Sequence, residues 1–176
     1  AYDEPLGVTY TSGVPSLSVW APTALTDPGV SVNVYDAAGA LLETKPMTLD
    51  ADSGIWKVTG TAAWDRKFYK IALKVFSYAT NSFVTNEVTD PYSVSLAMDS
   101  VRSQFVNLAD ADLKPAGWDA LVLTPLAAPE DLSIYELHVR DFSIADSSVP
   151  AADRGKFTAF DIPGTSGRNH LQQLAS

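Results

Sequence analysis

Apolar and polar residues alternate along most of the first ninety positions. In the segment VSVNVY (30–35) three valines alternate with polar residues, and in FYKIALKVFSY (68–78) apolar residues recur at every second position. A period of two is typical of strands that bury one face. Shorter segments at 16–19, 41–45, 55–58 and 83–85 follow the same pattern and are separated by turn residues such as Asp36-Ala37-Ala38-Gly39. The spacing predicts a mainly β, immunoglobulin-like antiparallel β-sandwich.

The pattern changes after Asp90-Pro91-Tyr92. Residues 94–131 show no clear period and contain Pro115, Pro125 and Pro129. They also carry many large apolar side chains, among them Phe105 and Trp118, which a solvated linker does not need. We therefore expect an ordered connector over 94–131.

A third region begins near residue 132. The segment SIYELHVRD (133–141) alternates, with Tyr135, Leu137 and Val139 on one face and Glu136, His138 and Arg140 on the other. This pattern predicts a strand. After a glycine-containing loop, Leu171 and Leu174 have the spacing of a helix that starts near Asn169.

Composition and charge narrow the classes of function. Hydrophobic residues make up 46% of the chain, as expected for a packed protein. A net charge of −9 disfavours nucleic acid and anionic lipid as partners, and no apolar run is long enough for a membrane span. The chain has no cysteine, and its two histidines are far apart in sequence, so we expect no metal site built on them. Neutral polysaccharides stay open as ligands.

Five motifs, in order, resemble one group of enzymes. The motif SVWAPTA (18–24) resembles the opening strand of carbohydrate-binding module family 48. The segments TNEVTDPYS (85–93) and LKP-GWD (113–119) are similar to the module exit and connector of pullulanases. IYELHVRDFS (134–143) resembles the first barrel strand of type I pullulanases and limit dextrinases, in glycoside hydrolase family 13, and residues 154–174 resemble the loop and helix that follow it.

The resemblance implies a domain order and an activity. Residues 1–93 are expected to form the family 48 module, 94–131 the connector, and 132–176 the first βα unit of an incomplete (β/α)8 barrel, truncated in its first helix. The parent enzyme is expected to be a retaining hydrolase of α-1,6-glucosidic bonds in pullulan, starch or glycogen. A bacterial-type secreted or periplasmic location is expected, with the cytoplasm left open.

The chain alone is expected to be inactive. A (β/α)8 barrel takes about 250 residues and keeps its site on the loops after all eight strands. A retaining glycosidase needs two carboxylates about 5–5.5 Å apart, which one βα unit cannot supply. None of the family's catalytic motifs occurs here, so we assign no catalytic residue. We expect residues 132–176 to need the remainder of the same enzyme as a partner, because a lone strand has two unpaired edges.

Three residues are candidates for binding an α-glucan such as maltooligosaccharide. Trp64 lies in a polar turn and is the best candidate of the four tryptophans for an exposed ring that stacks on a sugar, whereas Trp20 and Trp56 are expected in the core and Trp118 is expected to anchor the connector. The pair Tyr69-Lys70 resembles the Tyr-Lys of glycogen-binding family 48 modules, in which the lysine contacts a glucose hydroxyl. Phe83 stands where such modules keep a tryptophan.

Other ionisable residues have weaker claims to a role. His138 could be a general base, and Asp141 ends the predicted strand, but the family uses neither in catalysis. Asp50 and Asp52 could hold a calcium ion, although a plain turn explains them better, because the residue pattern of a dedicated calcium loop is missing. We predict no cofactor for this chain and leave calcium open for the parent enzyme.

Two other functions stay open. The chain could be a stand-alone α-glucan-binding module without enzymatic activity, or a spacer domain with an immunoglobulin-like fold. The motif at 134–143 argues against the spacer, which has no use for a barrel strand.

Overall fold

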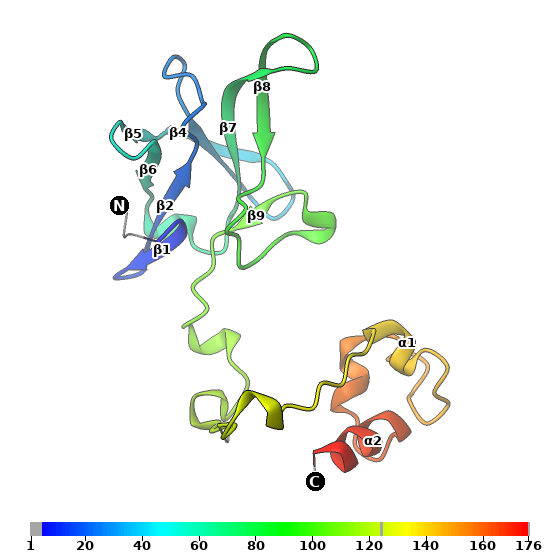
Figure 1. Ribbon diagram of the computed structural model, residues 1–176. Helices are drawn as coiled ribbons and strands as arrows, with labels where there is room; N and C mark the ends of the chain where they lie inside the picture. Colours follow the sequence, from blue (N-terminus) through cyan, green and yellow to red (C-terminus); the bar gives the residue numbers. More distant parts are fainter. Residues whose placement is uncertain (1–4, 124, 176) are drawn as a thin grey trace. The chain divides into compact units, whose positions relative to one another are not determined.

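The computed structural model describes residues 5–123 and 125–175 (Figure 1). The chain divides into two compact units, Ala1–Ala120 (unit 1) and Leu121–Ser176 (unit 2), which are described separately below. Among the described residues, every helix is too short or too polar to cross a membrane.

Unit 1 consists of two antiparallel sheets. The first sheet has the strand order β1 (Gly7–Thr11), β2 (Val14–Trp20), β6 (Ile55–Thr59) and β5 (Thr48–Asp50). The second has the order β4 (Leu41–Pro46), β3 (Ser31–Tyr35), β7 (Phe68–Ser77) and β8 (Ser82–Val88), and the short strand β9 (Ser103–Gln104) pairs with β7. Short 3-10 helices join these elements: η1 (Ala62–Trp64), η2 (Met98–Ser100), η3 (Ala111–Leu113) and η4 (Trp118–Ala120). The predicted antiparallel β-sandwich is confirmed.

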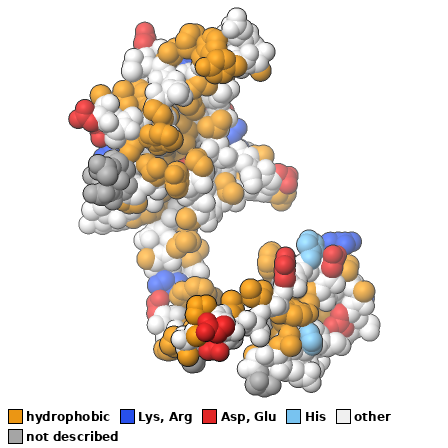
Figure 2. Space-filling view, viewed as in Figure 1, with side chains coloured by type: hydrophobic (Ala, Val, Ile, Leu, Met, Phe, Trp, Pro, Cys, Tyr) orange, Lys and Arg blue, Asp and Glu red, His pale blue; other side chains and the backbone are white. Residues whose placement is uncertain are grey.

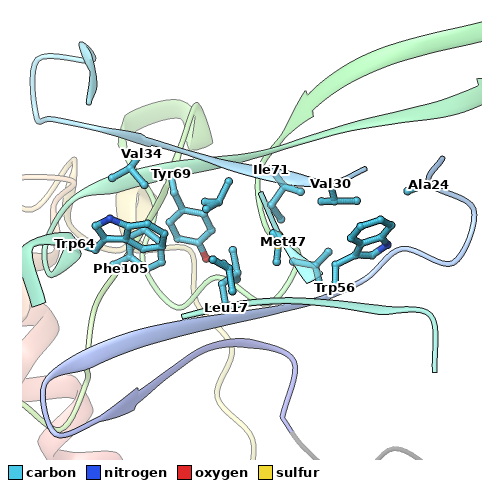
Figure 3. Packing of buried hydrophobic residues seen from close by; sticks show 13 residues of the cluster. Leu17, Ala24, Val30, Val34, Met47, Trp56, Trp64, Tyr69, Ile71 and Phe105 are labelled. Carbon is cyan, nitrogen blue, oxygen red and sulfur yellow. The ribbon is translucent and has the colours of Figure 1, made fainter. Parts of the chain in front are cut away.

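The core lies between the two sheets, where alternate side chains of each strand meet. Leu17, Val32, Tyr69 and Ile71 are fully buried, and Trp56 is buried as predicted. In Figure 3, Trp64, Phe105 and Tyr69 lie at one end of this core, and Trp56 and Ala24 lie at the other. The alternation observed in the sequence therefore marks the inward faces of β2, β3, β6 and β7.

The connector contributes to this core. Phe105 is 0% exposed, and its ring lies 4.2 Å from that of Tyr69 and 5.2 Å from that of Trp64. The Phe105 amide donates a hydrogen bond to the Lys67 carbonyl, and the Arg66 amide donates one to the Phe105 carbonyl, each at 2.9 Å. Compact unit 1 therefore includes residues beyond the expected end of the module at residue 93.

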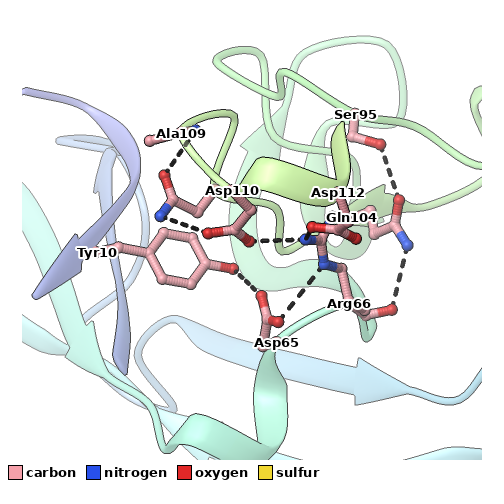
Figure 4. A network of polar contacts seen from close by, with 9 residues as sticks. Tyr10, Asp65, Arg66, Ser95, Gln104, Ala109, Asp110 and Asp112 are labelled. Atoms are coloured by element: carbon pink, nitrogen blue, oxygen red, sulfur yellow. Dashed lines mark hydrogen bonds and ion pairs between the residues drawn. The ribbon is translucent and has the colours of Figure 1, made fainter. Parts of the chain in front are cut away.

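A polar network attaches a further part of the connector to the sandwich (Figure 4). The Arg66 guanidinium lies 2.7 Å from the Asp110 carboxylate and 3.0 Å from that of Asp112. It also lies 3.5 Å from Asp65, which accepts a hydrogen bond from the Tyr10 hydroxyl. These groups are partly exposed, so the network positions residues 110–112 more than it stabilises the fold. Trp118 does not join this packing: its side chain is exposed on η4, and the expectation that it anchors the connector is wrong.

A buried carboxylate closes the end of the module. Asp90 is 4% exposed and accepts hydrogen bonds from the Tyr69 hydroxyl at 2.7 Å and from the Tyr92 amide at 2.9 Å. The Asp90 amide donates to the buried hydroxyl of Ser103. The motif Asp90-Pro91-Tyr92 thus joins the exit of the module to β7 and β9. Burial, together with the Asp90 charge, raises the pKa of the Tyr69 phenol above 10.0.

This shift predicts alkaline destabilisation. Because the folded-state pKa of Tyr69 is raised, its contribution to stability is complete below pH 10.0 and is lost as the pH rises above that value. The free energy of unfolding should fall by about 1.4 kcal/mol per pH unit from this one group. Urea unfolding between pH 9 and 11.5 measures the slope. The fall of the unfolding free energy with pH should be shallower for Tyr69→Phe. Tyr78→Phe, at an exposed position, should give the same slope as the unchanged chain. Equal slopes for all three proteins would show that Tyr69 is not the group responsible.

Unit 2 contains η5 (Pro129–Asp131), α1 (Val139–Ser143), η6 (Phe157–Asp161) and α2 (Ser166–Leu174). The rings of Phe142 and Phe160 stack at 4.9 Å, and the buried Ser143 hydroxyl accepts a hydrogen bond from the Gly155 amide. The predicted helix near residue 169 is confirmed and begins at Ser166. The predicted strand at 133–141 is wrong: residues 132–138 carry no regular element, and Val139 starts a helix. Strands are stabilised by pairing, and none of the described residues pairs with this segment.

Candidate functional site

The structure separates the three residues expected to bind sugar. Trp64 is 3% exposed, its ring lies 5.2 Å from that of Phe105 in a tilted arrangement, and its indole N–H donates a hydrogen bond to Glu43 at 2.8 Å. The expectation that this ring is exposed is wrong. The turn before β7 forms η1, which directs the indole into the core, and polar neighbours in sequence do not reveal this direction. Trp64 therefore has no free face for a sugar ring.

Lys70 belongs to a polar cluster on the outward face of the second sheet. We define the Lys70 cluster as Asn33, Tyr35, Thr44, Lys70 and Glu87. The Lys70 ammonium lies 3.7 Å from the Glu87 carboxylate, which accepts hydrogen bonds from the Asn33 amide at 2.6 Å and from the Tyr35 hydroxyl. The Thr44 hydroxyl donates to the Asn33 side-chain oxygen at 2.7 Å. Four strands thus supply one row of donors and acceptors.

The electrostatics of this cluster follow from its hydrogen bonds. The Tyr35 hydroxyl is the main cause that lowers the pKa of Glu87, with Asn33 and Lys70 acting in the same direction. Burial, followed by the bond to Glu87, raises the pKa of Tyr35. Glu87 is therefore ionised and Tyr35 neutral around pH 7. An ammonium group has three N–H donors, so the ion pair leaves Lys70 able to donate to a ligand hydroxyl.

Phe83 lies at the other end of the same sheet. It pairs with Phe76 on β7, six residues from Lys70, which is about 20 Å along a strand. Phe76 forms edge-to-face contacts with Phe83 at 5.4 Å and with Tyr78 at 5.2 Å. We call Phe76, Tyr78 and Phe83 the aromatic tip. Tyr78 is 92% exposed, so this tip can offer a ring to a ligand in a way that Trp64 cannot.

Glu87 and Tyr78 are site residues that the sequence pattern did not single out. The sequence carries a partial signal for both, because Tyr78, in the turn directly after β7, keeps the parity of Lys70, and β8 follows this turn. The pairing register that brings Glu87 beside Asn33 and Tyr35 depends on three strands and is not readable from local pattern. A row of hydrogen-bonding groups and an exposed aromatic cluster on one face are the groups that bind hydroxyl-rich ligands.

The remaining candidates lack the surroundings of a catalytic or metal site. Asp50 accepts hydrogen bonds from the Ser53 hydroxyl and the Asp52 amide, and the Ser53 bond is the main cause that lowers the pKa of Asp50. Its oxygens therefore cap a turn. His138 and Asp141 lie 3.6 Å apart, and both side chains are exposed. Within residues 5–123 and 125–175, no three His, Asp or Glu side chains are grouped so that they could hold a metal ion.

Comparison with known proteins agrees with the sequence motifs. The family model "Carbohydrate-binding module 48 (Isoamylase N-terminal domain)" matches residues 5–93. Pullulanase 1, chloroplastic, of Arabidopsis thaliana is 38% identical over 99% of this chain, and a pullulanase of Klebsiella aerogenes is 36% identical over 97%. A crystal structure of Klebsiella pneumoniae pullulanase complexed with maltotriose is 35% identical, with a TM-score of 0.89 over 98% of this chain and 16% of that one.

The two kinds of match differ in extent. The family model ends at residue 93, whereas the likeness to pullulanases continues through unit 2. The chain spans 18% of the Arabidopsis protein and 16% of the Klebsiella aerogenes protein. The expected relation to family 48 and to pullulanases is confirmed. Through residues 5–93, the chain belongs to the carbohydrate-binding module 48 family, the isoamylase N-terminal domains.

Proposed function

We propose that this chain is the N-terminal, non-catalytic portion of a starch-debranching enzyme that hydrolyses α-1,6-glucosidic bonds in pullulan, starch or glycogen. The observation that carries the proposal is the likeness to pullulanases over 97–99% of the chain, which includes unit 2 as well as the module. A stand-alone glucan-binding module would need unit 1 but not unit 2. In this proposal residues 1–93 are the module, 94–131 the connector, and 132–176 the start of the catalytic barrel.

The surface of unit 2 supports an adjoining polypeptide as partner. Ile134 is 81% exposed, and it lines a groove of about 400 Å³ together with Tyr135, Leu137, Leu171 and Leu174. Figure 2 shows hydrophobic side chains at the surface of this unit. Exposed apolar area costs about 25 cal/mol per Å² relative to burial, so covering this groove is favourable. The remaining strands and helices of a barrel are the cover that we propose.

The two units would have different tasks in the enzyme, because of what retaining hydrolysis requires. Retaining hydrolysis needs two carboxylates about 5–5.5 Å apart, held by loops from several barrel strands. Unit 2 would contribute the first of these strands once a neighbouring strand pairs with residues 133–138. Unit 1 would support the barrel and contact α-glucan through Lys70 and the aromatic tip.

A chimera tests the proposed activity. The segment of Klebsiella aerogenes pullulanase that matches this chain is replaced by this chain, and the release of reducing sugar from pullulan is measured. We expect the chimera to hydrolyse pullulan and the 176-residue chain alone to release none. A well-folded chimera without activity, or measurable activity of the isolated chain, would contradict the proposal.

Direct binding of sugar is tested separately. We expect Lys70→Ala and Phe83→Ala each to weaken the affinity of the chain for maltoheptaose about tenfold, because each removes a hydrogen bond or a stacking surface. Isothermal titration calorimetry measures the change. Lys156→Ala, an exposed lysine in unit 2, serves as the control and should bind as the unchanged chain does. Trp64→Ala is unsuitable because it would damage the core.

We also propose a secreted or periplasmic location for the enzyme. The relatives include chloroplastic and bacterial pullulanases, so the family itself occurs in more than one compartment.

A further inference from the structure

The outward face of the first sheet carries a groove that is separate from the Lys70 cluster. Leu17, Val19, Trp56 and Val58 point into the core, so the residues between them on β2 and β6 point outward. The strand register then places Ser16 beside Thr59, and Ser18 beside Lys57. Thr9 of β1 and Thr48 of β5 extend these two rows to the edges of the sheet. Together these six residues line a groove of about 590 Å³, which we call the hydroxyl groove.

Trp20 lies on the same outward face, in the next row along β2. It lies two residues from Ser18 on β2, which is about 7 Å along the strand. Its side chain is 61% exposed, so the expectation that Trp20 lies in the core is wrong. The reason is parity: Trp20 shares the outward face of Ser16 and Ser18.

Trp20 lies beside a buried apolar residue on the neighbouring strand. Its cross-strand partner Ile55 also points outward, yet it is 2% exposed, so side chains on the outward face cover it. Trp20 and Asp50 are the partners of Ile55 on its two neighbouring strands. Trp20 is therefore the cross-strand partner of a buried apolar residue, while its own side chain is largely open to solvent. A held aromatic ring loses little conformational entropy when a ligand stacks on it.

The chemistry of this face matches a neutral sugar. Five of its side chains are short hydroxyls, which both donate and accept hydrogen bonds as sugar hydroxyls do. Lys45, Lys57 and Asp50 also line the groove, so it carries charges of both signs and is not a purely basic site for an anion such as a phosphate chain. Its volume is within the range of ligand sites, which is about 300–1,000 Å³. The exposed indole supplies the apolar surface on which the C–H face of a sugar ring stacks.

We propose that the hydroxyl groove and Trp20 form a second oligosaccharide-binding surface, on the opposite sheet from Lys70 and Phe83. Trp20 stacks on one sugar ring, and the rows of Ser16, Ser18, Lys57 and Thr59 bind hydroxyls of the neighbouring rings. The choice of an α-glucan as ligand rests on the proposed function, whereas the groove and its preference for a neutral oligosaccharide do not.

The test is a nuclear magnetic resonance titration of the full 176-residue chain with maltoheptaose, and in parallel with cellohexaose. We expect maltoheptaose to shift the backbone amides of Ser16, Ser18 and Lys57 and the indole N–H of Trp20. Trp20→Ala should weaken binding at these amides about tenfold, and Trp20→Tyr, which keeps a ring, should restore most of it. Lys70→Ala should leave the shifts of this groove unchanged.

The outcomes separate this inference from the proposed function. Shifts confined to Lys70 and the aromatic tip would overturn the second surface and leave the proposed function intact. Shifts in the groove with cellohexaose alone would support the surface and argue against the α-glucan function. If neither sugar shifts the groove, and Trp20→Ala instead destabilises the active chimera, the face is a protein-docking surface and the inference is wrong.

Discussion

Truncation after Ser93, where the family match ends, is expected to unfold the sandwich, whereas truncation after Ala120 should leave unit 1 folded. The shorter chain loses β9 and Phe105, which is fully buried against Tyr69 and Trp64. Removal of one buried Phe side chain costs about 3–5 kcal/mol, and a domain of this kind has about 5–15 kcal/mol in total. Loss of the β9 pairing and of Val106, which is also buried, adds to this cost.

A single substitution isolates the core contribution. Phe105→Ala in the full chain should lower the free energy of unfolding of unit 1 by about 3–5 kcal/mol, because it leaves a cavity between two aromatic rings. Urea unfolding followed by near-ultraviolet circular dichroism measures it. Leu108→Ala, three residues further along but exposed, should change stability by less than about 0.5 kcal/mol. If the chain of residues 1–93 unfolds at the same urea concentration as that of 1–120, the connector is dispensable and this prediction fails.

Asp90→Ala should be the most damaging change of a charged residue in unit 1, at about 3 kcal/mol. The substitution leaves the Tyr69 hydroxyl, which is buried, and the Tyr92 amide without their acceptor. Asp90→Asn should cost less, because its one side-chain oxygen can replace only one of the two carboxylate oxygens that accept these bonds.

A control variant and a double-mutant cycle show whether the lost hydrogen bonds cause the destabilisation by Asp90→Ala. Asp119→Ala removes an exposed carboxylate that pairs with Lys114, and it should change stability by less than about 1 kcal/mol. Combining Asp90→Ala with Tyr69→Phe should cost less than the sum of the two changes, because the second removes the orphaned hydroxyl. Strict additivity, or equal effects of Asp90→Ala and Asp119→Ala, would show that the buried contact contributes nothing.

The tryptophans show how far local pattern reaches. Trp56 lies between outward residues on β6, and both the pattern and the structure place it in the core. Trp20 was expected there too, although its parity with Ser16 and Ser18 already pointed outward; a general preference of large aromatics for burial outweighed that local signal. Trp64 was expected outside, but Phe105, some forty residues later in the chain, completes its pocket. Burial that depends on so distant a partner leaves no trace in the neighbouring residues.

Unit 2 shows a second limit. The alternation at 133–139 is real, and the resemblance to a barrel strand rests on the same residues, yet in this chain the segment has no regular structure before α1. Strand propensity expresses the fit of side chains to neighbouring strands more than a backbone preference. The helix at Ser166–Leu174 needed no such neighbour, because its hydrogen bonds close within the element.

The amino-acid sequence therefore specifies the strand periods, the antiparallel sandwich, the C-terminal helix and the relation to pullulanases, all of which depend on local alternation or on short motifs. The tertiary structure alone places Phe105 in the core, assembles Glu87, Tyr35 and Asn33 around Lys70, and puts Phe83 far from Lys70. These features depend on strand register and on contacts between residues distant in sequence. The burial of Trp64 also depends on such contacts, because Phe105 and Glu43 hold its indole inside, whereas the outward side chain of Trp20 follows from its parity with Ser16 and Ser18.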